Sequence, residues 1–593
     1  MSDMKNQETA NEGYELKLRV EPSRAGIPTL KFIEGSQQFY IHSRYNPEAE
    51  AEKWAVSFYE EGKKLFILIG IGLGYQAKAL LSKMKENERL LLVEPVKEIF
   101  DMAVQDGNIN QILKDERVIF CCTDNNMASR QVFLDVLRGG LITDYKLYIS
   151  PVYLRIFTHQ TNEAVKIFED IIRFEQININ TVKFFAAQWQ NNYLRNMFIA
   201  AKSCPYLLFK QRFSCPVVIV SAGPSLTSEL PFLKSLYNKA VIIAAGSAVT
   251  TLKKNGIKPH IIVSIDGGMQ NYRHFKQLDY DDVPLFYSPE IHYKILEEYK
   301  GPKVVFQFYH KDLSNWYNEL LGFETGTVVA GLSVANVALD IALQVSNGPV
   351  CFIGQDLGYT DGYSHAEGNI NRKSLEEFKE KGRELIEIEA NDGSKLWTDY
   401  VYLDMKNWFE NYLICNKDRQ VYNATLKGAK IKGMIPIKFA DFIENYCKAE
   451  SDIAGQIKEI LSEHHFCRDA ELKENVLEIV YRLEHLKMLT LNGKKTAAKL
   501  LEAVESREIK KIEKLLKKME KIDEELKEIE DKDIFLFFIR QPLLIKFNYS
   551  YIPEKIEDDK FIAKENYFFY ETLYNMTENV LRILSDQING VVK

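Results

Sequence analysis

A repeated alternation of short apolar strands and helical segments begins at Pro216 and constrains the fold more than any other feature of the sequence. Its first strands read VVIVSAGPSL, VIIAAGSAV and HIIVSIDGG, and each apolar run ends in small or polar residues. Further strands are expected at PLFYSP, KVVFQFYH and GPVCFIGQDLGY, with a helix at Ser333–Val345 before the last of them. Buried strands that alternate with helices are typical of doubly wound sheets. We therefore predict a doubly wound α/β domain at residues 211–437.

Regions of different character flank this domain. Residues 1–160 contain a strand that breaks into glycines, LFILIGIGLG, then a helical pattern and a second strand, LLLVEP, which together predict a Rossmann-like α/β domain. Residues 161–210 are rich in Asn, Gln and aromatic residues and are expected to form a helical connector. Residues 438–593 carry apolar residues at helical spacing and few glycines. They predict a helical domain for packing or oligomerisation, with solvated charged faces.

Charge, cysteines and apolar runs limit the classes of function. The net charge is only −7 and no basic face stands out, so nucleic acid is not an expected partner. The eight cysteines include no CxxC pair and no metal-ligand spacing, which fits reduced thiols in the cytosol. No apolar stretch is long enough to span a bilayer, and the N-terminus lacks an export signal. We expect a cytoplasmic protein, and the sequence leaves an oligomer open.

A glycine-rich motif follows the strand near residue 65. It reads Gly70-Ile71-Gly72-Leu73-Gly74-Tyr75, and Glu94 lies twenty residues after its last glycine. This layout admits a nucleotide, with the acid on a ribose, as in adenosylmethionine or dinucleotide sites. Glycine-rich turns also occur where the backbone needs only tight packing, and we interpret this one as a scaffold.

A second turn, Ser221-Ala222-Gly223-Pro224-Ser225-Leu226, directly follows the strand Val217–Val220. It presents backbone N–H groups and a hydroxyl at a helix N-terminus, which attracts phosphate. Ser225 is otherwise a simple N-cap, but Gly223 and Pro224 leave room for a ligand against the backbone. We predict that these three residues contact a nucleotide phosphate.

A single carboxylate, Asp266, ends the strand in SIDGG. It faces the crevice outside the carboxyl ends of the sheet, where it is suited to a ribose or a metal. Strand-end aspartates also cap turns, and one carboxylate makes a poor metal site.

The densest polar cluster runs from Gly354 to His365, where a buried strand ends in Gln355, Asp356, two tyrosines and a histidine. A histidine titrates near neutrality, so His365 is the candidate general base, with Asp356 as a further catalytic candidate. Tyr359 and Tyr363 are suited to hydrogen-bond a leaving phosphate. A loop histidine can instead be merely exposed to solvent.

The segment VYNATLKGAKIKG follows a further strand at the same inferred edge. Asn423 and Thr425, like Gln355, are expected to contact the nucleotide. Lys427 is suited to phosphate or carboxylate charge, although a turn lysine is more often solvated.

Taken in order along residues 215–436, these motifs resemble the motility-associated factor (Maf) family of flagellin glycosyltransferases. The resemblance rests on SAGPSL, SIDGG, the helix start Gly331–Asn336, GQDLGY with its downstream SHAEG, and VYNATLKGAKIKG. The three-part layout also looks like that family. The resemblance implies transfer of a CMP-activated nonulosonic acid, such as pseudaminic or legionaminic acid, to Ser or Thr of flagellin. It implies no required cofactor, with Mg²⁺ as an optional assisting ion.

The same domain is similar to small bacterial sialyltransferases, which use CMP-sialic acid. By this resemblance, Gly223–Ser225 contact the phosphate region, Ser333 the sugar or cytidine, and Tyr359 and Tyr363 the departing phosphate. The base of those enzymes is a histidine just before a helix, whereas the comparable stretch here, Asn391–Ser394, has none. His365 is then a displaced substitute.

Two alternatives stay open at this point. The archaeal 6-hydroxymethylpterin pyrophosphokinase family, which transfers pyrophosphate from ATP with magnesium, also resembles the central domain. A non-catalytic flagellin-binding chaperone, whose helical end grips a partner, is the third hypothesis.

Overall fold

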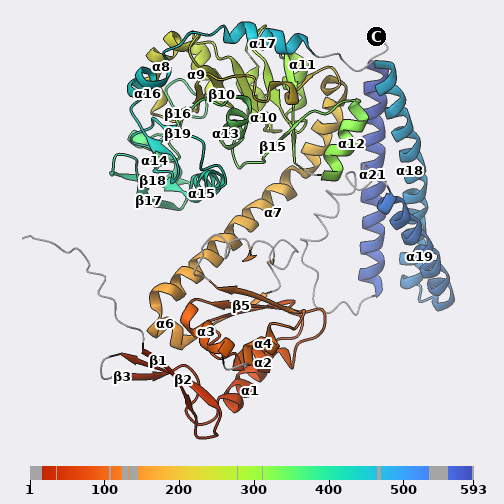
Figure 1. The fold of residues 1–593 in the computed structure, drawn as a ribbon. Helices are drawn as coiled ribbons and strands as arrows, with labels where there is room; N and C mark the ends of the chain where they lie inside the picture. Colours follow the sequence, from red (N-terminus) through yellow and green to blue (C-terminus); the bar gives the residue numbers. More distant parts are fainter. Residues whose placement is uncertain are drawn as a thin grey trace, which may run out of the picture. The chain divides into compact units, whose positions relative to one another are not determined.

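A computed structural model describes residues 17–34, 37–105, 108–122, 132, 133, 136, 145–276, 278–309, 311–463, 469–532 and 559–590. The chain forms two compact units, with the first extending to Val182 and the second beginning at Lys183. The long helix α7 (Thr158–Ala200) starts in the first and ends in the second (Figure 1). It contains most of the predicted connector, which continues into β8 (Cys204–Pro205) and a 3₁₀ turn at Tyr206–Phe209.

The described residues of the first unit form two sheets. An antiparallel sheet is formed by β1 (Lys17–Pro22), β2 (Pro28–Glu34) and β3 (Gln37–Tyr40). A parallel sheet has the order β6-β5-β4-β7, made of β4 (Leu65–Ile69), β5 (Arg89–Glu94), β6 (Val118–Cys122) and β7 (Tyr145–Ile149). Its helices are α1 (Pro47–Phe58), α2 (Tyr75–Leu81), α3 (Lys97–Gln105), α4 (Asn108–Ile112) and α6 (Pro151–Ile156). The strand, turn, helix and strand predicted between Leu65 and Glu94 are all present.

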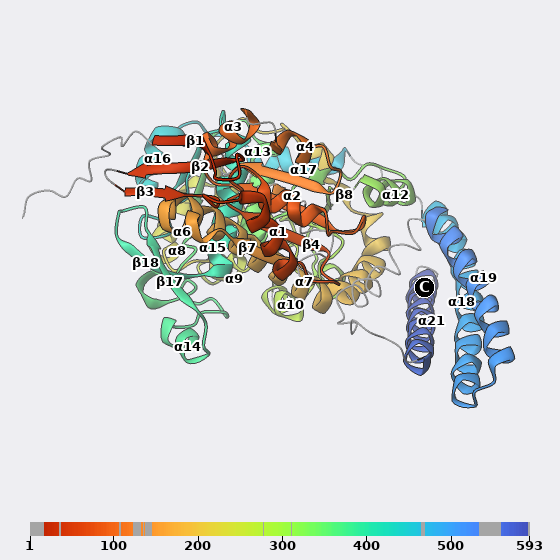
Figure 2. The ribbon, with the colours of Figure 1, turned by 90° about the horizontal axis from the view of Figure 1, so that it is seen from below.

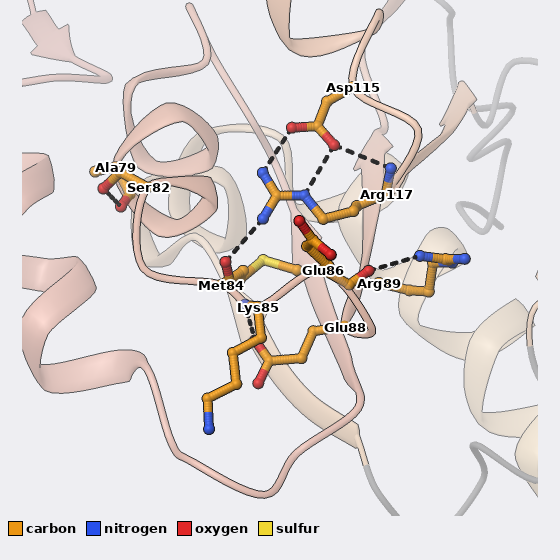
Figure 3. Close-up of polar contacts among 9 residues, drawn as sticks. All are labelled: Ala79, Ser82, Met84, Lys85, Glu86, Glu88, Arg89, Asp115 and Arg117. Atoms are coloured by element: carbon orange, nitrogen blue, oxygen red, sulfur yellow. Dashed lines mark hydrogen bonds and ion pairs between the residues drawn. The ribbon is translucent and has the colours of Figure 1, made fainter.

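Arg117 ties two connections of this parallel sheet together (Figure 3). Its Nε and Nη2 donate to the two carboxylate oxygens of Asp115 at 2.9 and 2.6 Å, and its Nη1 donates to the Met84 carbonyl at 2.8 Å. This bidentate pair lowers the pKa of Asp115 to about 2. The start of β6 is thereby fixed to the turn that leads into β5.

The second unit is built on a nine-stranded sheet whose pairings are all parallel, which confirms the predicted α/β class. The strand order is β20-β19-β16-β9-β10-β11-β12-β13-β8. The strands are β9 (Val217–Val220), β10 (Val241–Ala245), β11 (Ile261–Ser264), β12 (Leu285–Tyr287), β13 (Lys303–Val305), β16 (Val350–Ile353), β19 (Val421–Asn423) and β20 (Ile435–Pro436). Two small sheets pair β14 (Gln307–Phe308) with β15 (Thr327–Val328), and β17 (Leu385–Glu389) with β18 (Lys395–Asp399).

The order in which strands are added to this sheet reverses at β9, although all the strands remain parallel. Strands β10 to β13 extend on one side of β9, whereas β16, β19 and β20 extend on the other. The crevice outside the carboxyl ends at such a switch point is where open α/β sheets bind ligands.

Helices cover both faces of the sheet, since alternate residues of its strands enter two separate cores. Val218 and Val220 of β9 belong to one core, and Val217 and Ile219 belong to the other. The helices of this region are α8 (Leu226–Leu233), α9 (Ala248–Lys254), α10 (Met269–Phe275), α11 (Tyr293–Glu298), α12 (Lys311–Leu321), α13 (Val334–Val345), α14 (Leu375–Glu380), α15 (Tyr400–Ile414), α16 (Phe439–Tyr446) and α17 (Ile453–Ser462).

Amides of α7 attach the second half of this helix to the carboxyl edge of the sheet. Asn192 Nδ2 donates to the carbonyls of Gly267 and Glu290 at 3.1 and 3.0 Å. Asn196 Nδ2, one turn later, donates to the carbonyls of Pro289 and Ile291 at 2.8 Å each. The Asn-rich stretch therefore supports the loops after β11 and β12.

From Asp469 on, the described residues of the C-terminal region form long helices, as the spacing of apolar residues predicts. They are α18 (Asp469–Glu505), α19 (Ile509–Lys532) and α21 (Asp559–Gly590), which lie side by side (Figures 1 and 2). Ion pairs join Lys494 to Glu571 at 2.9 Å and Lys487 to Glu578 at 3.3 Å, so α18 and α21 run antiparallel.

Within the described ranges, no helix is both long and apolar enough to cross a membrane. Cys204, Cys215, Cys351, Cys415 and Cys447 form no disulfide in this part of the chain. Cys467 lies outside the described residues.

Candidate functional site

Three of the predicted motifs meet at the switch point of the nine-stranded sheet. Ser221, after β9, donates from Oγ to Gln355 Oε1, after β16, at 2.6 Å. The Gln355 N–H donates to Thr425 Oγ1, after β19, at 3.1 Å. The Ala366 N–H, beside His365, donates to the Ala222 carbonyl at 2.9 Å. Three neighbouring strand ends and the loop that carries His365 thus form one polar cluster.

The carboxylate of Asp356 lies against the turn that was predicted to receive phosphate. Its Oδ2 accepts from Ser225 Oγ at 2.7 Å and from the Ser225 N–H at 3.3 Å. A Cβ on Gly223 would lie 2.1 Å from this same oxygen, so the missing side chain of Gly223 is what allows Asp356 to approach. Pro224, half-buried, completes the turn. The space expected to hold a ligand is filled by Asp356, and an anion at the start of α8 has to displace that carboxylate.

Asp356 is held in an unusual local structure. It is buried, and burial raises the pKa of its carboxyl to about 6. The next residue, Leu357, has φ of 49°, a left-handed conformation that a bulky side chain rarely adopts. Asp361 has φ of 51° in the same loop. Strained residues of this kind cluster at functional sites, where the surrounding structure holds them in place.

His365 is half-buried beside the turn after β9. Its Nδ1 lies 3.0 Å from Ser364 Oγ, and Nε2 has no hydrogen-bond partner among the described residues. Burial lowers the pKa of the imidazole to about 4, with smaller contributions from His274 and Lys373. The ring is therefore neutral at pH 7, as a general base requires.

The two predicted tyrosines differ in accessibility. Tyr359 is buried, and its hydroxyl donates to Asp399 Oδ2 at 2.7 Å, where Arg383 also donates at 2.6 Å. Tyr363 is 39% exposed, and the guanidinium of Arg372 stacks on its ring at 3.9 Å from the centroid. Tyr363 is thus the tyrosine that is open to a ligand in this conformation, beside a cation.

Asn423 and Thr425 build the edge of the site from β19. Asn423 is fully buried, and its Oδ1 accepts from the Thr425 N–H at 3.0 Å. Its Nδ2 has no partner in the part of the chain that the structure describes. Lys427 is exposed and pairs with Asp361 at 2.9 Å. Asn391 donates from Nδ2 to the Thr425 carbonyl at 2.9 Å, so the loop that begins at Asn391 reaches the same edge.

Among the described residues, Asp266 and Ser333 make no hydrogen bond to this cluster. Asp266, after β11, is exposed, and its carbonyl accepts from Asn271 Nδ2 at 2.7 Å. Ser333 forms a capping box with Asn336 at the start of α13, as a helix start predicts. A Cβ on Gly246, after β10, would lie 3.2 Å from Val334, so the start of α13 lies beside the end of β10.

The glycine-rich loop of the first unit is filled by side chains of that unit. The N–H groups of Ile71, Gly72 and Leu73 donate to Glu94 Oε2, the Tyr153 hydroxyl and His42 Nε2, at 3.1, 3.0 and 2.8 Å. A Cβ on Gly70 would lie 2.6 Å from the Tyr153 ring. The backbone donors that a nucleotide would need are already used, which supports the scaffold interpretation.

Several residues of the site have no clear signal in the sequence. Ser364 and His274 lie next to His365, and Arg372 stacks on Tyr363. Ser364 directly precedes His365, which is a weak signal. His274 lies on α10 and Arg372 in the loop before α14, so neither residue belongs to a motif of the sequence.

Comparisons with known proteins define the class of the central region. Residues 191–362 match the family described as 6-hydroxymethylpterin diphosphokinase MptE-like. No curated protein matches the chain. The second unit therefore carries an MptE-like α/β domain.

The chain as a whole is similar in fold to the solved structure of a Maf glycosyltransferase from Magnetospirillum magneticum AMB-1. The TM-score is 0.54 and the sequence identity 14%, over 96% of this chain and 92% of that chain. The two comparisons confirm the resemblance predicted from the motifs: a Maf-like fold with an MptE-like central domain.

Proposed function

We propose that this chain is a cytoplasmic glycosyltransferase that transfers a CMP-activated nonulosonic acid, pseudaminic or legionaminic acid, to Ser or Thr of flagellin, and thereby supports flagellum assembly and motility. The observation that carries the proposal is the contact of Ser225 with Asp356 at the switch point of the sheet, where the loop that carries His365 is also bonded to Ala222 through the Ala366 N–H. The fold, similar to that of a Maf glycosyltransferase, supports the same class.

The proposed reaction forms a bond between the acceptor oxygen and the anomeric carbon, and breaks the bond from that carbon to the CMP phosphate. The acceptor proton passes to His365 Nε2, and CMP leaves with the bonding electrons. A nonulosonic acid ionises through an oxocarbenium-like state, so orientation, phosphate stabilisation and proton removal are what the protein must supply. The chemistry requires no cofactor, and Mg²⁺ enters only as an optional assisting ion.

The donor's phosphate is proposed to bind at Gly223–Ser225 after Asp356 moves away, with Tyr363 beside it. Gln355, Asn423 and Thr425 then shape the nucleotide pocket from the neighbouring strands, partly through buried contacts. Ser333 is proposed to face the sugar or cytidine, and Asp266 the ribose. Tyr359 is also proposed to bind the departing phosphate, which requires its hydroxyl to leave Asp399 Oδ2.

A second candidate function has its own support. The match of residues 191–362 to the 6-hydroxymethylpterin diphosphokinase MptE-like family favours transfer of pyrophosphate from ATP to a pterin. This activity would use the same switch point, but with ATP and magnesium in place of a CMP-sugar.

Mass spectrometry of flagellin tests the first proposal. Flagellin from cells with the gene should carry nonulosonic acid masses that are absent without it. Complementation with His365→Ala should lower modification by about a hundredfold, because general-base catalysis contributes at least that much. His159→Ala, which changes a histidine whose side chain is 87% exposed on α7, is the matched control and should restore modification. Unchanged flagellin masses after gene deletion would contradict the proposal.

A further inference from the structure

The hydroxyl of Ser364 is the centre of a small hydrogen-bond network next to His365. Ser364 Oγ lies 3.0 Å from His365 Nδ1, 3.1 Å from the N–H of Lys373 and 3.4 Å from the carbonyl of Asn371. Ser364 is buried, so solvent does not compete for these contacts.

Ser364 has a single hydroxyl hydrogen to donate, and this determines which ring nitrogen of His365 carries the proton. A hydroxyl has one hydrogen to donate and two lone pairs to accept with. The Lys373 N–H is a donor and the Asn371 carbonyl is an acceptor, so Ser364 accepts from the first and donates to the second. Its remaining lone pair then faces His365 Nδ1, which must carry the proton. Only in this tautomer are all three contacts hydrogen bonds at once.

The same loop is fixed from its other side. Asn371, whose carbonyl accepts from Ser364, places its side-chain Nδ2 at 3.1 Å from Nε2 of His274 on α10. Asn369 Nδ2 donates to the carbonyl of Ser247, after β10, at 3.2 Å. The loop that carries this network is therefore bonded to α10 and to the segment after β10.

We propose that Ser364 is a positioning residue that holds the His365 imidazole with its proton on Nδ1, and so leaves the lone pair of Nε2 to receive the acceptor proton. This inference rests on the proposed function and adds to it the tautomer of the general base, His365. Ser364 itself does not touch the substrate. Ser364 orients the His365 imidazole, and His365 in turn accepts the proton of the acceptor hydroxyl.

The tautomer can be measured without any substrate. In the full chain labelled with ¹⁵N-histidine, the two ring nitrogens of His365, assigned by the signals lost in His365→Gln, report which one is protonated. The wild type should show a proton on Nδ1, and Ser364→Ala should shift His365 toward the Nε2-protonated form. A wild-type His365 protonated on Nε2 would overturn the proposal, as would an unchanged spectrum in folded Ser364→Ala.

Ser374→Ala is the matched control for this measurement. Ser374 lies in the same region and caps α14 through a capping box, but its hydroxyl contacts Glu377 and no imidazole. This variant should lose some stability and leave the His365 signals in place. If Ser364→Ala does not fold, the wild-type spectrum alone still decides the tautomer.

A double-mutant cycle separates this inference from the proposed function. Ser364→Ala should lower transfer by about tenfold or more, within the hundredfold or more that general-base catalysis supplies. In a His365→Ala background it should have no further effect, because Ser364 acts through His365. Additive losses would show a structural role and overturn the proposal. An absence of transfer in the wild type would instead contradict the proposed function, while the tautomer measurement would remain valid.

Discussion

At the scale of single residues, burial shifts the pKa values of Asp356 and His365 in opposite directions. It raises the pKa of Asp356 to about 6 and lowers the pKa of His365 to about 4. At pH 7 Asp356 is therefore mostly charged and His365 is neutral. A charged Asp356 at the start of α8 competes with any phosphate that binds there.

This competition predicts that binding of a CMP-sugar depends on pH. As the pH falls from 7.5 to about 5.5, Asp356 takes up a proton and no longer repels the donor phosphate, so affinity should rise by up to about tenfold. A phosphodiester donor analogue keeps its charge over this range, and titration calorimetry measures its affinity. Asp356→Asn should bind tightly at both pH values. A wild-type affinity that is independent of pH would show that Asp356 is not displaced.

Gly223 offers a second prediction at this scale. Gly223→Ala should cost about 1 to 3 kcal/mol of stability, because the new Cβ would overlap Asp356 Oδ2 and the Gly354 carbonyl. Gly268→Ala is the matched control, since a Cβ there meets nothing within 4 Å. Urea unfolding of the full chain compares the two. Equal stability of both variants would contradict the close approach of Asp356.

At the scale of elements, the strands and the turns after them follow from local pattern. The apolar runs at Val217–Val220 and Val350–Ile353 are buried strands. The small and polar residues that follow each strand meet at the carboxyl edge of the sheet. The contacts of Asp356 do not follow from local pattern, because they join residues more than a hundred positions apart. For the same reason, the attachment of Asn192 and Asn196 to the sheet loops is not visible in the composition of the connector.

The glycine-rich element of the first unit provides a prediction about pH and stability. Burial raises the pKa of Glu94 to about 8, against the opposing effect of its hydrogen-bond donors. Between about pH 5 and 8, the unfolded chain releases this proton and the folded chain keeps it, so stability should fall by up to several kcal/mol as the pH rises. Glu94→Gln should flatten that slope. Hydrogen exchange of β4 and β5 in the full chain, compared between wild type and variant at each pH, measures the difference. Parallel slopes would contradict a protonated Glu94.

At the scale of the whole molecule, the chain combines the parallel sheet of the first unit, the nine-stranded sheet and the C-terminal helices. The match to the MptE-like family covers part of the second unit, whereas the likeness to the Maf glycosyltransferase structure covers nearly the whole chain. The proposed transfer to flagellin assigns the regions outside the MptE-like match to the protein acceptor. The choice between the two candidate functions depends on which nucleotide occupies the switch point.

Titration calorimetry of the full chain with CMP and with ATP tests that choice most directly. We expect that CMP binds and that ATP with magnesium binds much more weakly. Ser225→Ala should weaken CMP binding by about 1 to 3 kcal/mol through loss of a phosphate contact. His365→Ala should leave CMP affinity unchanged, since its role is in proton transfer. No binding of CMP at millimolar concentration, together with clear binding of ATP, would contradict the glycosyltransferase account and favour pyrophosphate transfer.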